Sequence, residues 1–272
     1  MKPLWNAKTL LLSPEVAWDY LNYQVSKLKN AGQAVRFFPN DIKVTNLSGF
    51  SEFHSCSQYL SWKERKFLQK YPIDKGDLID VGANIGIVSM IMAKRFPESQ
   101  IHAFEPNPST FQALQNNIAI NDLTNIQAEQ YALAGYKGEI SFTADSIHRA
   151  TCSIATLVDQ HTVFVPCTRL DSYLEKRSVK EIAFLKVDVE GYETLVFQGA
   201  ENMLKRQQAK LIYYEVCPLL TQKAGFEPEL PTRMLIKSGY QICKLNDRSC
   251  LIPVNLTNIN QVNLENWIAI RS

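Results

Sequence analysis

One stretch decides the fold: Leu78-Ile79-Asp80-Val81-Gly82-Ala83-Asn84-Ile85-Gly86. Its first residues are mostly apolar and predict a buried strand, and the glycines that follow lead into a helix. Gly82 lets the chain leave the strand in a conformation that other residues adopt only at a cost, and Gly86 lets the helix pack closely on the sheet. A glycine-rich turn between a strand and a helix is typical of nucleotide-binding α/β proteins.

Two features of this loop favour S-adenosylmethionine over NAD as its ligand. The glycine spacing is G-x-x-x-G rather than the G-x-G-x-x-G of dinucleotide-binding loops. Asp80 adds a carboxylate near the strand end, which would attract a sulfonium and an ammonium group and repel a pyrophosphate. The alternative is a loop that binds nothing, because such turns also occur in α/β proteins without a ligand there.

A second acid follows the next predicted strand. Residues 100–106 are largely apolar up to Glu105, roughly twenty residues beyond the glycines. A carboxylate in this place can accept two hydrogen bonds from the cis diol of a ribose. The alternative is a solvated glutamate at a strand end.

The bulk composition predicts one globular catalytic domain with a small extension. The chain has 272 residues, 46% of them hydrophobic, and a formal net charge of +2. So small a net charge predicts neither a nucleic-acid partner nor an anionic membrane as partner. The sequence shows no signal peptide and no apolar run near the roughly 18 residues of a membrane span.

The cysteines predict a reducing compartment, and we expect a cytoplasmic protein. None belongs to a C-x-x-C pair, so buried thiols are expected rather than a zinc site. The six are Cys56, Cys152, Cys167, Cys217, Cys243 and Cys250.

Residues 1–70 are expected to form an N-terminal extension, and residues 71–272 the main domain. The extension begins with an amphipathic helix that opens at Ser13 and stops at Gly32. A short hairpin over residues 35–45 follows, which serves as a lid, as a dimer surface or as plain packing; a homo-oligomer is left open. A capping box at Ser61 and Glu64 opens the last helix.

Strands and helices alternate in the main domain, which predicts a parallel sheet. After the second acid we expect a third strand over residues 126–133, an added strand over 139–143 and a fourth strand over 182–187, with one helix through Leu204. A fifth strand covers residues 209–215. Strands over 240–245 and 267–270 end the chain as an antiparallel hairpin. Residues 145–161 lack a clear period and are expected to form a long loop, a candidate lid over the ligand cleft.

The fourth strand carries charge where strands are usually apolar. Lys186, Asp188 and Glu190 alternate with valines, so in an extended chain they share one face. Ligands of open parallel sheets bind beyond the carboxyl ends of the strands, which suggests acid-base chemistry here. The alternative is that Lys186 pairs with Asp188 or Asp80 to hold the strand end.

Four motifs give the chain a resemblance to the FkbM-type methyltransferases, over about residues 71–215. They are DVGANIG at 80–86, FEPNP at 104–108, RLDSYL at 169–174, and LKVDVEGYE followed by QGA at 185–200. The resemblance implies a Rossmann-like class I methyltransferase fold, with a seven-stranded, mostly parallel sheet and an antiparallel terminal strand. It also implies S-adenosylmethionine as cofactor and O-methylation of a sugar, a glycan or a glycosylated natural product.

The resemblance also implies a set of cofactor-binding residues at the strand ends. Where many methyltransferases have a further glycine, this chain has Asn84, which binds the cofactor carboxylate or caps the loop. The predicted contacts are Asp80, Gly82, Asn84, Gly86 and Glu105, with the adenine near Tyr131 and Ala132.

For the reaction we expect Asp188 or Glu190 as the base or as the group that orients the acceptor, with His148 as second choice. Asp188, Glu190 and Glu215 form an alternative Mg²⁺ site, because all three are oxygen ligands at neighbouring strand ends. The acceptor is expected to be a small molecule or a glycan. Two other functions compete: a nicotinamide-dependent oxidoreductase, and a non-catalytic module that keeps the fold for protein contacts.

Overall fold

The computed structural model describes residues 20, 21, 23–25, 36–38, 42–45, 60–143 and 162–271. Residues 20, 21 and 23–25 are helical and belong to the first predicted helix. The rest of that helix, the predicted lid over residues 145–161 and His148 within it lie outside the described residues.

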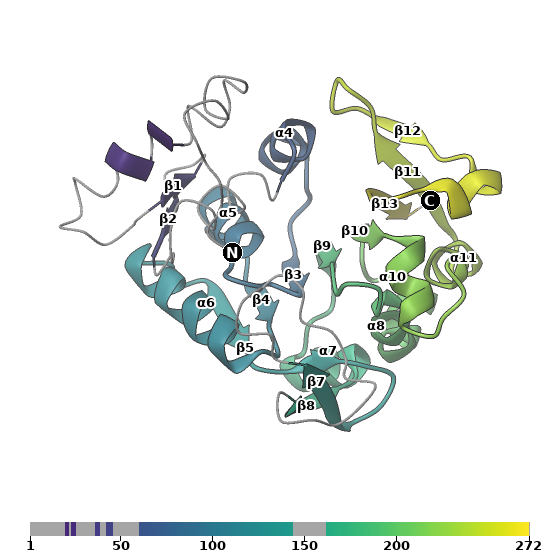
Figure 1. Ribbon diagram of the computed structural model, residues 1–272, viewed down its shortest axis with the longest axis horizontal. Coiled ribbons are helices and arrows are strands. Elements are labelled where there is room, and N and C mark those ends of the chain that lie inside the picture. The colour runs from purple at the N-terminus through teal and green to yellow at the C-terminus, as the bar shows by residue number, and fades with distance from the viewer. Residues whose placement is uncertain are drawn as a thin grey trace, which may run out of the picture.

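Eight strands form the large sheet: β3 (Asp77–Val81), β4 (Ile101–Phe104), β5 (Ile126–Glu129), β9 (Ile182–Val187), β10 (Leu211–Val216), β11 (Tyr240–Leu245), β12 (Leu251–Pro253) and β13 (Glu265–Arg271). Their order is β12-β11-β13-β10-β9-β3-β4-β5 (Figure 1). The strands from β10 to β5 are parallel, and β13 is antiparallel to β10 and to β11. The mostly parallel sheet and the terminal antiparallel hairpin are therefore confirmed. There are eight strands rather than seven, because the short β12 pairs with β11.

Helices cover both faces of this sheet (Figure 1). One face carries α4 (Trp62–Lys70), α5 (Ile87–Arg95) and α6 (Pro108–Ile120), and the other α7 (Leu170–Arg177), α8 (Glu193–Gly199), α9 (Glu201–Lys205) and α11 (Leu230–Lys237). Leu78 and Phe184 face the first group, whereas Ile79 and Leu185 face the second, as strand alternation requires. The remaining helices are α10 (Pro218–Lys223) after β10 and the 3-10 helix η1 (Leu256–Gln261) after β12. None of the helices in the described part is long and apolar enough to cross a membrane.

The predicted third strand is wrong in its extent. The chain leaves the large sheet after Glu129, and β6 (Ala132–Leu133) belongs to a second sheet with the order β6-β8-β7. Its other strands are β7 (Gly138–Thr143), which was expected, and β8 (Thr162–Thr168), which was not. The stretch over residues 126–133 contains no proline or glycine, so the sequence does not mark the point where the chain changes sheets.

The single helix expected through Leu204 is two helices, α8 and α9, which meet at Ala200. Gly199 is the last residue of α8, and a Cβ atom there would lie 2.2 Å from the Ala134 carbonyl oxygen. The end of α8 therefore lies against the chain that follows β6.

The described parts of the extension pack on the main domain. The predicted hairpin is confirmed as β1 (Arg36–Phe38) paired with β2 (Ile42–Val44). Asn121 of α6 accepts a hydrogen bond from the Lys43 amide at 2.8 Å and donates one to the Lys43 carbonyl at 2.7 Å. The capping box at Ser61 is confirmed as well. The boundary at residue 70 stays a prediction.

Candidate active site

The loop between β3 and α5 needs both of its glycines. Gly82 has φ +74°, and a Cβ atom there would lie 1.8 Å from the Asp188 carbonyl oxygen. Gly86, the N-cap of α5, has φ +91°, and a Cβ atom there would lie 2.5 Å from Leu114 Cδ1. L side chains disfavour these angles, so the loop can form only with glycine at both positions.

Asn84 caps this loop. Its backbone has φ 51°, a left-handed conformation that asparagine tolerates better than most residues. Its Oδ1 accepts a hydrogen bond from the Ile85 amide at 2.8 Å. Of the two roles predicted for Asn84, the structure bears out capping, and its contact with the cofactor carboxylate stays a prediction.

Glu105 joins the loop to the helix after β4. It is buried, and its two carboxylate oxygens accept from the Asn84 and Asn107 amides, each at 2.9 Å. Burial raises its pKa to about 7, although the two hydrogen bonds oppose the shift. Each oxygen keeps a second lone pair, so the carboxylate can still accept from ribose hydroxyls. That contact remains a prediction.

Asp80 is buried, with one oxygen in an ion pair and the other in a hydrogen bond. Its Oδ1 lies 3.2 Å from Lys186 Nζ, and its Oδ2 accepts from Ser89 Oγ at 2.6 Å. A lysine therefore balances the charge that was predicted to attract the cofactor. A direct contact between Asp80 and the cofactor stays a prediction.

Lys186 connects the glycine loop with the acidic end of β9. Its Nζ lies 3.4 Å from Asp188 Oδ2 and donates to the Gly82 carbonyl at 3.1 Å. Burial lowers the pKa of this ammonium, but the charges of Asp80 and Asp188 outweigh burial and the pKa is raised. The prediction that Lys186 pairs with the neighbouring acids is confirmed.

Glu190 lies just beyond β9, in the tight turn between β9 and α8. Its backbone has φ 55°, which is strained for a residue other than glycine. Burial raises its pKa to about 7, with a further rise from Asp188 and an opposing effect of Lys186. A carboxyl with such a pKa changes its charge near neutral pH, as a general base must.

Two further carboxyls stand beside Glu190: Glu215, which the sequence analysis named only as an alternative Mg²⁺ ligand, and Glu193, which it did not name. Glu215 is the last residue but one of β10, the strand next to β9, and burial together with Asp188 and Glu190 raises its pKa. Glu193, the first residue of α8, is fully buried and accepts hydrogen bonds from the loop backbone. Its position in the sequence could have indicated Glu193, because an acid in the first turn of a helix that follows the charged strand lies close to that strand's end.

The remaining predicted site residues lie at the same edge of the sheet or outside the described part. Tyr131 is partly exposed and follows β5, whose end is paired with the end of β4. Ala132 opens β6 in the second sheet. Their contacts with adenine stay predictions, as does the role of His148. Among the described residues, no three His, Cys, Asp or Glu side chains are grouped so as to hold a metal ion. The predicted Mg²⁺ ligands Asp188, Glu190 and Glu215 therefore do not form such a group in this structure.

Comparison with known proteins adds three relatives and one family. The family model described as the methyltransferase FkbM domain matches residues 80–242. Methyltransferase 1 of Beauveria bassiana is 31% identical over 153 residues, which are 47% of this chain and 60% of the relative. Hexuronic acid methyltransferase AglP of Haloferax volcanii is 32% identical over 172 residues, 62% of this chain and 66% of the relative. Ribosomal RNA small subunit methyltransferase G of Campylobacter jejuni is 26% identical over 188 residues, 64% of this chain and 96% of the relative.

The fold and the glycine loop define a Rossmann-like α/β protein, and its candidate site lies at the carboxyl ends of parallel strands. Because the family model covers more than half of the sequence, the chain belongs to the FkbM methyltransferase family. The family and the fold imply S-adenosylmethionine as the methyl donor. The chain spans less than two thirds of the length of the first two relatives.

Proposed function

We propose that the protein methylates a hydroxyl group of a sugar, a glycan or a glycosylated metabolite, with S-adenosylmethionine as donor. The observation that carries the proposal is the place of the half-buried Glu190 carboxyl, two residues beyond the Asp188 carbonyl that meets Gly82 of the glycine loop. Burial raises the pKa of this carboxyl to about 7. The relative from Haloferax, named for hexuronic acid, supports a sugar acceptor. The membership in a methyltransferase family favours this function over a nicotinamide-dependent oxidoreductase or a non-catalytic module.

The donor fits the residues of the loop. Gly82 has no side chain where the Asp188 carbonyl meets the loop, which lets the loop take its shape, and Glu105 has lone pairs left for a ribose. We propose that Gly82, Asn84 and Glu105 hold the donor, with Tyr131 and Ala132 beside its adenine. When bound, S-adenosylmethionine supplies a methyl group activated on a sulfonium.

Glu190 acts as the base in this proposal. Its carboxylate would accept the proton of the acceptor hydroxyl as that oxygen takes the methyl group that a bound donor would supply. Asp188 is held by Lys186 at 3.4 Å, so its role is to orient the acceptor rather than to take the proton. With a net charge of +2, we propose a small molecule or glycan rather than a nucleic acid as acceptor.

A screen with a labelled methyl donor tests this function. Sugar nucleotides, glycosides and ribosomal RNA are offered in parallel, with and without a chelator, since the proposed base needs no metal ion. We expect label in a sugar hydroxyl in both conditions; label in ribosomal RNA alone would overturn the sugar assignment. Activity that depends on the metal would restore the Mg²⁺ alternative.

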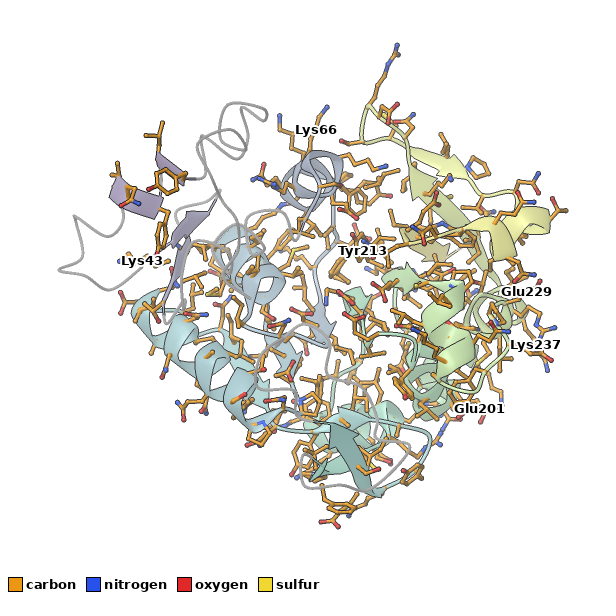
Figure 2. All side chains as sticks on the ribbon, in the orientation of Figure 1. Lys43, Lys66, Glu201, Tyr213, Glu229 and Lys237 are labelled. Atoms are coloured by element: carbon orange, nitrogen blue, oxygen red, sulfur yellow. The ribbon has the colours of Figure 1, made fainter. Side chains whose placement is uncertain are left out.

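Variants then test the base. Glu190→Gln should lower turnover by about 10²–10⁴-fold, Asp188→Asn by less, and neither should change the affinity for S-adenosylmethionine. Glu201→Gln is the matched control, because Glu201 is exposed at the start of α9 (Figure 2). Unchanged turnover in both acid variants would remove these residues from the mechanism.

A further inference from the structure

The tight turn that carries the proposed base is held by a buried carboxyl. Glu193 Oε1 accepts hydrogen bonds from the Val189 amide at 3.2 Å and from the Gly191 amide at 3.3 Å. These two amides flank Glu190 on either side. Glu193 is 1% exposed, so no solvent can replace its oxygen as an acceptor for them.

The same turn is fixed from two other directions. A Cβ atom at Gly191 would lie 2.5 Å from the Leu220 carbonyl carbon, so α10 lies against the turn at this residue. The Asp188 carbonyl faces Gly82 of the glycine loop, and the Asp188 amide donates to the Val81 carbonyl at 3.1 Å. The strained backbone of Glu190 is therefore held by the glycine loop, by α10 and by the hydrogen bonds to Glu193.

We propose that Glu193 is a positioning residue, which acts through its hydrogen bonds to the 188–191 turn and so aims the Glu190 carboxyl at the acceptor hydroxyl. The effect on catalysis rests on the proposed function, whereas the hydrogen bonds of Glu193 to the turn do not. Burial raises the pKa of Glu193 to about 7, so near neutral pH the group is part charged and part neutral. An acceptor oxygen is present in both forms, and hydrogen bonding rather than charge is the constant feature of this side chain.

Two variants separate hydrogen bonding from charge. Glu193→Gln keeps an oxygen for the two amides and removes the charge, whereas Glu193→Ala removes both. Glu201→Ala is the matched control, because Glu201 is likewise the first residue of its helix but is bonded only at the surface, to Lys205. All variants are compared in the full chain.

The exchange rates of the Val189 and Gly191 amide hydrogens, followed by NMR, report directly on the hydrogen bonds to Glu193. We expect faster exchange at Val189 and Gly191 in Glu193→Ala, and wild-type rates in Glu193→Gln and in the control. Unchanged exchange at both amides in Glu193→Ala would overturn the proposal. Because this experiment needs neither donor nor acceptor, its result does not depend on whether the proposed function holds.

Kinetics with the acceptor found by the screen then test the consequence. Displacement of the base in Glu193→Ala should lower kcat on the order of 10²-fold, with little change in the dissociation constant of S-adenosylmethionine. The acid limb of the pH profile should move to lower pH, because a freed Glu190 loses the burial that raises its pKa. Loss of folding alone would leave that limb in place. A Glu193→Gln variant as inactive as Glu193→Ala would show that charge, not hydrogen bonding, matters, and would also overturn the proposal.

Discussion

Replacing Lys186 by methionine tests the electrostatic core of the site. The side chain is 2% exposed and its Nζ meets three acceptors: Asp80 Oδ1 at 3.2 Å, Asp188 Oδ2 at 3.4 Å and the Gly82 carbonyl at 3.1 Å. Methionine has a similar length and no charge, so the variant leaves two carboxylates facing each other at the sheet edge. Removing one partner of a buried ion pair costs about 3–5 kcal/mol. In a chain of this size that corresponds to a fall in Tm on the order of 10 °C.

Urea unfolding followed by tryptophan fluorescence measures the loss, with Lys205→Met as the matched control. Lys205 pairs with Glu201 at 2.7 Å on the surface of α9, where both side chains are more than half exposed, so no measurable loss is expected. The double variant Lys186→Met with Asp80→Asn should regain part of the stability, because it removes one of the unpaired charges. A Lys186→Met variant as stable as the control would refute the reasoning.

Three further predictions follow from single contacts. Gly82→Ala should abolish the binding of S-adenosylmethionine in calorimetry, because the new Cβ atom would overlap the Asp188 carbonyl; binding at wild-type strength would refute the close approach. Glu190→Gln should match the wild type in stability at pH 4 and exceed it at pH 8. The pKa of the Glu190 carboxyl is about 7 in the folded protein, which is above its unfolded value. The stability that the carboxyl contributes below the unfolded pKa is therefore lost as the pH rises through 7. A variant with the same stability as the wild type at both pH 4 and pH 8 would contradict this. Asn121→Ala should speed proteolysis of the β1–β2 hairpin, because it removes two hydrogen bonds to β2. The control is Asn116→Ala, which removes a surface hydrogen bond with Gln112 in α6 and none to β2; equal rates would speak against this attachment.

The glycine loop and the strands that follow it could be predicted because local chemistry determines them. Gly82 and Gly86 both have positive φ angles, and few other residues adopt these without strain. The capping box at Ser61 was likewise readable, since both of its hydrogen bonds join residues three positions apart.

Contacts between distant segments could not be predicted in the same way. The chain leaves the large sheet after Glu129 without a turn residue to mark it, and Pro166 argues against the strand that β8 in fact forms. Lys186 pairs with Asp80, which lies 106 positions earlier in the chain; the sequence offered Asp80 and Asp188 as alternative partners, and no local pattern shows that Lys186 meets both. Burial, which raises the pKa of Glu190 and Glu193, is a property of the packed molecule.

The most direct test of the central claim is a calorimetric titration of the wild-type protein with S-adenosylmethionine and, separately, with NAD. The glycine loop and Glu105 are expected to give saturable binding of S-adenosylmethionine at one site per chain and no heat with NAD. Binding of NAD without binding of S-adenosylmethionine would contradict the account.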